Sequence, residues 1–182
     1  GNPHAIFLGD YINKGPDPAR VLDLLLARQR AGAVTLLAGN HETALLACLE
    51  SGDLAPFLKM GGATTIRSYL HREVHPNVLA DFREHLPDAH LSAIRAMPMI
   101  WESKQVVAQH VPPNTAVAKF QISAHAPVGT LPTINKDSAQ LDTGCGSDAE
   151  TGRLTALLWP TLDFIQVDSN GVLIRSDSRV RR

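Results

Sequence analysis

Two short apolar runs, at residues 5–8 and 33–38, begin the pattern of hydrophobic positions along the chain. Each run is closed by a glycine and a polar residue, which predicts a buried strand with a loop at its carboxyl end. Between the runs, apolar positions at helical spacing follow Pro18 and end near Gly32. Proline suits the first turn of a helix, and glycine suits its end. The opening therefore predicts strand, helix and strand, with the strands parallel and joined by a right-handed crossover.

The rest of the chain divides into a helical part and a strand-rich part. Apolar spacing typical of helices recurs at residues 43–50, 63–71, 77–86 and 90–96. Shorter runs that predict strands follow at residues 99–101, 105–107, 120–123, 139–142, 154–159, 164–168 and 172–175. The triplet Ser169-Asn170-Gly171 predicts a hairpin turn between the last two runs.

Composition narrows the class of protein. The chain has 182 residues, 44% of them hydrophobic, so we predict a single domain over 1–182 with a sizeable core and a frayed tail at 177–182. A net charge of −1 argues against nucleic acid as a partner. No apolar run has the ~20 residues that a membrane span needs. With only two cysteines, we expect no disulfide framework and a cytoplasmic location.

The ends of the first two predicted strands carry the candidate chemistry. Asp10 follows the first strand, and Gly39-Asn40-His41-Glu42 follows the second. Carboxyl ends of parallel strands meet at one sheet edge, where open α/β folds bind ligands. Asn40 offers a carbonyl oxygen to a hard cation, and His41 can exchange a proton near neutral pH.

Four segments together carry a resemblance to a known family. They are Gly9-Asp10-Tyr11-Ile12-Asn13-Lys14-Gly15, then Gly39-Asn40-His41-Glu42, then Ala124-His125-Ala126-Pro127-Val128, and finally Leu141-Asp142-Thr143-Gly144 with residues 152–157. In this order they resemble the calcineurin-like metallophosphoesterases, and most of all the phosphoprotein phosphatase branch with its bacterial and diadenosine-tetraphosphatase-like members. The resemblance runs from about residue 5 to residue 160.

The resemblance implies an α/β fold, a four-layer αββα sandwich of two mixed sheets. We expect the family's first strand and helix to be missing, because a predicted core strand is reached as early as residue 5. It also implies a metal-dependent phosphoric-ester hydrolase that uses a metal-bound hydroxide as nucleophile. The cofactor would be a divalent metal, most of all Mn²⁺, with Fe or Zn as alternatives. The substrate would be a phosphorylated protein or a small phosphate ester or nucleotide.

The same resemblance assigns roles to individual residues. His41 would be the general acid, Asn13 would orient it, and Lys14 would bind the phosphate. The metal ligands would be Asp10, Asn40 and His125.

Several positions depart from the family's motifs. Asn13 stands where the family has aspartate, and Lys14 where it has arginine. Ala108 takes the place of a ligand histidine, so His110, two residues later, is either a loop residue or a recruited metal ligand. The family's opening Asp-x-His motif has no counterpart in the sequence. These departures keep an alternative open, a degenerate relative that is weakly active or inactive and binds a phosphorylated partner or a single metal ion.

Two further expectations follow from the pattern. If the strand at 5–8 lacks its neighbour, its edge is exposed, and we predict self-association through that edge. The remaining histidines are interpreted as solvated residues at helix ends and in loops, and these are His4, His71, His75, His85 and His90.

Overall fold

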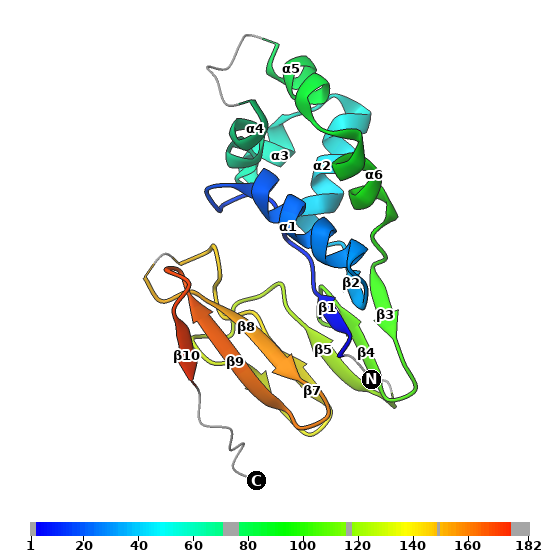
Figure 1. Cartoon of the computed structure of the whole chain (residues 1–182), viewed down its shortest axis with the longest axis vertical. Helices are drawn as coiled ribbons and strands as arrows, with labels where there is room; N and C mark the ends of the chain where they lie inside the picture. Colours follow the sequence, from blue (N-terminus) through cyan, green and yellow to red (C-terminus); the bar gives the residue numbers. More distant parts are fainter. Residues whose placement is uncertain (1–2, 71–76, 116–117, 149, 176–182) are drawn as a thin grey trace. The chain divides into compact units, whose positions relative to one another are not determined.

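The computed structural model describes residues 3–70, 77–115, 118–148 and 150–175. The chain divides into two compact units, Gly1–Trp101 and Glu102–Arg182 (Figure 1). The prediction of a single domain is not tested by this division and stays a prediction. The expectations for His71, His75 and the tail at 177–182 lie outside the described residues.

The first unit opens with the predicted strand, helix and strand. Strand β1 (Ala5–Phe7) pairs in parallel with β2 (Val34–Leu36), with Ile6 opposite Thr35. Helix α1 (Pro18–Arg30) connects them and begins with its proline in the first turn. The Asp17 carboxylate accepts a hydrogen bond from the Arg20 backbone N–H, which caps the helix as N-cap acids do. The parallel pair is therefore confirmed.

Among its described residues, the first unit contains five further helices. They are α2 (Asn40–Ser51), α3 (Ala55–Lys59), α4 (Gly62–Leu70), α5 (Val78–His85) and α6 (Asp88–Ala96) (Figure 1). The predicted start of α2 at residue 43 was wrong, because the helix already begins at Asn40. The Glu42 side chain accepts from the Gly39 N–H and so caps the helix from inside its first turn. Helix α3 was missed, since one and a half turns are too short to show periodicity.

The core of this unit lies between its helices. Each of five helices contributes one side chain with at most 1% of its surface exposed, namely Leu22, Leu45, Phe57, Phe82 and Ile94. Burial of this apolar surface is the main stabilising term for such a helical layer.

A polar contact also lies in this core and corrects one expectation. His90 is only 5% exposed, so its interpretation as a solvated histidine was wrong. Its Nδ1 lies 2.8 Å from the Tyr69 hydroxyl, and its Nε2 lies 3.1 Å from an Asp23 carboxylate oxygen. Both ring nitrogens thus have partners, which is what a buried imidazole requires.

The second unit consists mainly of strands. A five-stranded sheet has the order β3-β4-β5-β7-β6, with bounds Ile100–Glu102, Val106–Gln109, Phe120–Ser123, Ser138–Gln140 and Thr133–Ile134, and β3 includes the last two residues of the first unit. Its middle strands β4, β5 and β7 are parallel, and β6 is antiparallel to β7, so the sheet is mixed. Strand β6 was not predicted, because two residues form no pattern.

A three-stranded antiparallel sheet follows, with β8 (Arg153–Leu158), β9 (Asp163–Asp168) and β10 (Leu173–Arg175) in the order β10-β9-β8 (Figure 1). The predicted turn at Ser169–Gly171 is confirmed, since the Asp168 N–H donates to the Val172 carbonyl and Gly171 has a φ of 78°. Among the described helices, none combines the length and the apolar character of a membrane span.

Candidate active site

A buried carboxylate joins the loop after β1 to the start of α2. Glu42 is fully buried, and its two oxygens accept from the backbone N–H groups of Gly39, Asp10 and Tyr11, each at 2.8 Å. Burial raises the pKa of Glu42, while the three N–H donors oppose that shift. The carboxylate therefore fixes the backbone on which Asp10 is mounted.

Two glycines allow these two segments to approach closely. Gly9 has a φ of 99°, and a Cβ there would lie 2.5 Å from the Gly39 backbone nitrogen. A Cβ on Gly39 would lie 2.1 Å from an Asp10 carboxylate oxygen. No larger residue fits at either position without moving the backbone. The glycines thus place the Asp10 carboxylate beside the N-terminus of α2, where Asp10 Oδ1 accepts from the His41 N–H at 3.2 Å.

His41 lies in the first turn of α2 and is 6% exposed. Its Nδ1 lies 2.7 Å from the Asn13 side-chain nitrogen, and its Nε2 lies 3.7 Å from an Asp10 carboxylate oxygen. The Asn13 amide oxygen accepts a hydrogen bond from the Thr65 hydroxyl at 2.7 Å. The structure therefore brings the predicted residues Asp10, Asn13 and His41 together within the first unit.

Lys14 and Asn40 belong to the same region. Asn40 is half-buried and is the first residue of α2, and Lys14 is exposed in the loop after β1. The loop has left-handed backbone at Asp10, Asn13 and Lys14, with φ values of 60°, 68° and 55°. Positive φ at a non-glycine residue costs free energy, and such conformations are typical of functional loops.

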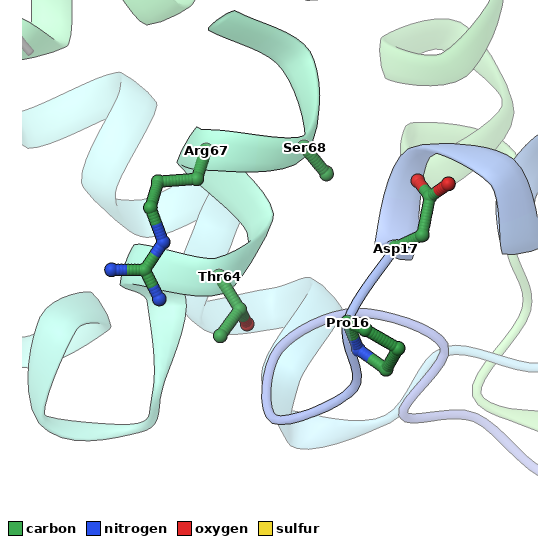
Figure 2. Close-up of a pocket in the computed structure, with 5 residues that line it drawn as sticks. All are labelled: Pro16, Asp17, Thr64, Arg67 and Ser68. Carbon is green, nitrogen blue, oxygen red and sulfur yellow. The ribbon is translucent and has the colours of Figure 1, made fainter. Parts of the chain in front are cut away.

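A cavity of about 310 Å³ lies next to this loop. Figure 2 shows Pro16 and Asp17 from the segment before α1 on one side, and Thr64, Arg67 and Ser68 from α4 on the other. Its walls carry a cation and a carboxylate, so it suits a polar ligand rather than an apolar one.

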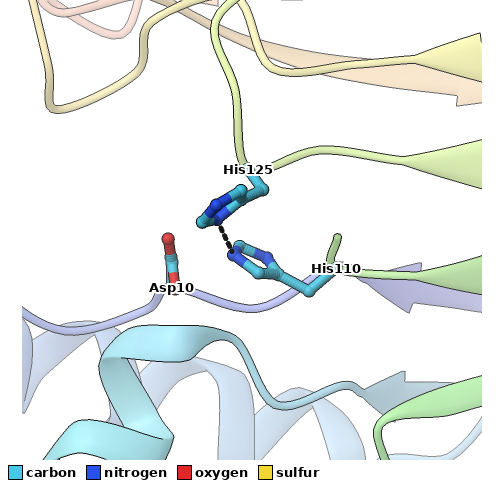
Figure 3. Close-up of side chains that lie close together, drawn as sticks. All are labelled: Asp10, His110 and His125. Atoms are coloured by element: carbon cyan, nitrogen blue, oxygen red, sulfur yellow. Dashed lines mark hydrogen bonds between the residues drawn. The ribbon is translucent and has the colours of Figure 1, made fainter. Parts of the chain in front are cut away.

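A pair of histidines stands at the ends of two parallel strands in the second unit. His110 follows β4 and His125 follows β5, and these strands pair in parallel with Ala108 opposite Ile122. The His110 Nε2 lies 3.1 Å from the His125 Nδ1, and the rings meet edge to face at 74° (Figure 3). The Ala124 N–H donates to the His110 carbonyl at 2.9 Å, which ties the two strand ends together.

The position of Ala108 explains why His110 takes this place. Ala108 lies within β4 and is 1% exposed, so a side chain there points into packed surroundings. His110 lies past the strand end, where the chain is free to turn its ring toward His125. His110 itself is 3% exposed.

Residues 1–129 match the family model described as calcineurin-like phosphoesterase. The chain belongs to the calcineurin-like phosphoesterase family. The resemblance inferred from the motifs is thereby confirmed. Members of this family use divalent metals to hydrolyse phosphoric esters.

A solved structure supports the fold of this calcineurin-like phosphoesterase. It is described as a "putative diadenosine tetraphosphatase" and superposes with a TM-score of 0.62 at 18% identity, covering 92% of this chain and 82% of the other. The predicted α/β class with mixed sheets is confirmed. A search of curated proteins finds no significant match.

Two residues of this phosphoesterase site were missed at the sequence level. Glu42 was seen only as part of a motif, and Thr65 was not singled out. Glu42 sits three residues after Gly39, the spacing of a capping carboxylate, so its cap could have been predicted. Thr65 lies 52 residues from Asn13 in the sequence, and no local sequence pattern predicts that contact.

Proposed function

We propose that this chain is a phosphoric-ester hydrolase that works with a divalent metal, and that its substrate is a phosphorylated protein or a small phosphate ester or nucleotide. The observation that carries the proposal is the assembly at the start of α2. There Glu42 holds the backbone of Asp10, and the Asp10 carboxylate lies beside the buried ring of His41.

The donor groups fit a divalent metal. Asp10, His110 and His125 each offer an oxygen or nitrogen ligand atom, and Asn40 offers a carbonyl oxygen. Two imidazole nitrogens bound to one ion at about 2.1 Å lie about 3–3.5 Å apart. The 3.1 Å between His110 Nε2 and His125 Nδ1 fits this separation. We propose that His110 and His125 act as a pair of metal ligands. From the family's motifs we propose Asp10 and Asn40 as ligands as well, with Mn²⁺ preferred over Fe or Zn.

A divalent ion in such a site activates water and neutralises charge on the phosphoryl group. The chain's own residues would bind the phosphate and protonate the leaving group. Lys14, exposed beside the Asp10 segment, binds the phosphate oxygens as a point charge. His41 delivers a proton to the leaving oxygen from its Nε2, the nitrogen that lies toward Asp10. Asn13 holds the ring through Nδ1.

Hydrolysis of p-nitrophenyl phosphate with added Mn²⁺ tests this function. We expect turnover that a chelator abolishes and that Mn²⁺ restores. His125→Ala should reduce Mn²⁺ affinity and turnover at least tenfold, since a metal site loses most of its affinity when one of its coordinating side chains is removed. His85→Ala is the matched control, because His85 is exposed and contacts only a carbonyl of its own helix, that of Asp81, among the described residues. Equal Mn²⁺ affinity in the two variants would contradict the assignment of His125.

A second candidate function rests on a specific observation. Because Asn13 brings no charge to His41, the chain could be a relative that binds a phosphorylated partner, or a single metal ion, with little or no turnover. Saturable binding of a phosphopeptide by a preparation that is fully loaded with Mn²⁺ but does not hydrolyse it would favour this function over the first.

A further inference from the structure

A buried chain of three polar side chains runs from helix α4 to the ring of His41. Thr65 is 0% exposed, Asn13 is 5% exposed and His41 is 6% exposed. The contacts between them are 2.7 Å from Thr65 Oγ1 to Asn13 Oδ1 and 2.7 Å from Asn13 Nδ2 to His41 Nδ1. Since these side chains are almost fully buried, their polar atoms need hydrogen-bond partners within the chain.

The hydroxyl of Thr65 has a defined direction. One of its lone pairs accepts the backbone N–H of Asn13 at 2.8 Å, so its own hydrogen must find an acceptor elsewhere. The Asn13 amide oxygen provides that acceptor. An amide carries its acceptor and its donor at opposite ends, so an oxygen facing Thr65 leaves the NH₂ group facing His41.

The reversed amide is disfavoured by the surroundings of Thr65. With NH₂ toward Thr65, the hydroxyl hydrogen would need another acceptor. The carbonyl of Gly61, just before α4, already accepts from the Thr64 hydroxyl at 3.0 Å and from the Thr64 N–H at 3.3 Å. Among the described residues, the acceptor recorded for this hydroxyl is the Asn13 amide oxygen. A buried donor without a partner costs more than the hydrogen bond gained.

We infer that Thr65 is a positioning residue for His41. Its hydroxyl fixes the Asn13 amide with Nδ2 donating to His41 Nδ1, and this keeps Nδ1 free of a proton and places the ring proton on Nε2. The geometry stands by itself, whereas its meaning for catalysis rests on the proposed function. There, Nε2 is the atom that faces Asp10 and that would carry the proton for the leaving oxygen.

The inference also explains how Asn13 can replace an acidic residue. A carboxylate would accept a hydrogen bond from a protonated Nδ1, whereas the amide held by Thr65 donates a hydrogen bond to an unprotonated Nδ1. Thr65 and Asn13 together therefore select one tautomer of the neutral ring.

Nuclear magnetic resonance of the whole chain labelled with ¹⁵N tests this directly. A scalar coupling between two nitrogen nuclei passes through a hydrogen bond only where one nitrogen donates to the other. In alkaline buffer, where the ring is neutral, we expect such a coupling between Asn13 Nδ2 and His41 Nδ1, together with a non-protonated shift for Nδ1. The ring signals are assigned by their loss in His41→Gln.

Three variants separate positioning from structure. Thr65→Val should abolish the coupling and move the Nδ1 shift toward the average of two tautomers. Thr65→Ser keeps the hydroxyl and should restore both signals. Thr64→Val is the matched control on the same helix, because the hydrogen bond recorded for the Thr64 hydroxyl within the described part of the chain goes to the Gly61 carbonyl, and it should leave both signals unchanged.

Two results would overturn the inference. The first is a protonated Nδ1 without coupling to Asn13 in the unmodified chain, which would mean that the amide is reversed. The second is a Thr65→Val protein that is folded and keeps the coupling. If Thr65→Val does not fold, the unmodified chain and Thr65→Ser still decide the amide direction. Neither reading depends on turnover, so an inactive chain would reject the proposed function and leave this inference to be judged separately.

Discussion

Replacing Glu42 by glutamine should weaken the hydrogen bonds that hold the loop after β1 against the start of helix α2. The carboxylate accepts three backbone N–H bonds at 2.8 Å, two on Oε2 and one on Oε1. Glutamine has one acceptor oxygen. If that oxygen takes the place of Oε2, the NH₂ group faces the Tyr11 N–H, and one donor is left without a partner.

The magnitude follows from these three bonds. In two of them the acceptor changes from a charged to a neutral oxygen, which costs about 1 kcal/mol each. The third bond is lost, which costs about 1–3 kcal/mol. The burial that raises the pKa of Glu42 also makes its charge costly, and removing the charge recovers part of the loss. We therefore expect Glu42→Gln to lower the free energy of unfolding by about 2–4 kcal/mol, a large share of the 5–15 kcal/mol typical of a domain.

Urea unfolding followed by circular dichroism measures this loss. Glu50→Gln is the matched control, because Glu50 lies on the same helix and is exposed. Hydrogen exchange adds a local measurement, since the amides of Asp10 and Tyr11 should exchange about 30- to 1,000-fold faster, the factor that corresponds to 2–4 kcal/mol. A Glu42→Gln protein within about 0.5 kcal/mol of the unmodified chain, with unchanged exchange at these amides, would refute the reasoning.

Two further predictions concern the proposed general acid His41 and the buried tyrosine side chains. Asn13→Asp should raise turnover of an alkyl phosphate at neutral pH by about 10-fold or more, because a carboxylate beside Nδ1 favours a protonated His41. Turnover of p-nitrophenyl phosphate should rise by less, because the alkoxide leaving group needs a proton and p-nitrophenolate does not. Equal rates on the alkyl phosphate at matched metal content would contradict His41 as the acid. Burial raises the pKa of both Tyr11 and Tyr69. Below pH ~10 both phenols are neutral in the folded and in the unfolded chain, so their burial does not lower the free energy of unfolding there. Above pH ~10 the phenols ionise in the unfolded chain first, so the free energy of unfolding falls by about 1.4 kcal/mol per pH unit for each phenol. Urea unfolding at several alkaline pH values should show this decline, and Tyr69→Phe should remove about half of it. An unchanged slope in Tyr69→Phe would be inconsistent with a buried neutral phenol at that position.

The helices and strands near the motifs were predictable because their signals are local. An apolar run closed by Gly9 predicts β1, and proline followed by spaced leucines predicts α1. The motif residues Asp10 and His41 could likewise be placed at strand ends, since parallel neighbours bring their carboxyl ends to one edge. The family match over residues 1–129 agrees with this part of the sequence analysis.

The contacts that shape the site were decided by the tertiary structure. Thr65 reaches Asn13 across 52 residues only because α4 packs beside the loop after β1, and sequence periodicity reports which face of a helix is apolar but not which loop it meets. His110 was open to two interpretations until the pairing of β4 with β5 placed its ring against His125. His90 was interpreted as a solvated residue because the sequence shows no partner for it, yet the packing of α6 buries it against Tyr69. In each case the deciding partner is distant in the chain, so the sequence by itself determined most of the elements and their chemistry, and only the folded chain determined which side chains share a hydrogen bond.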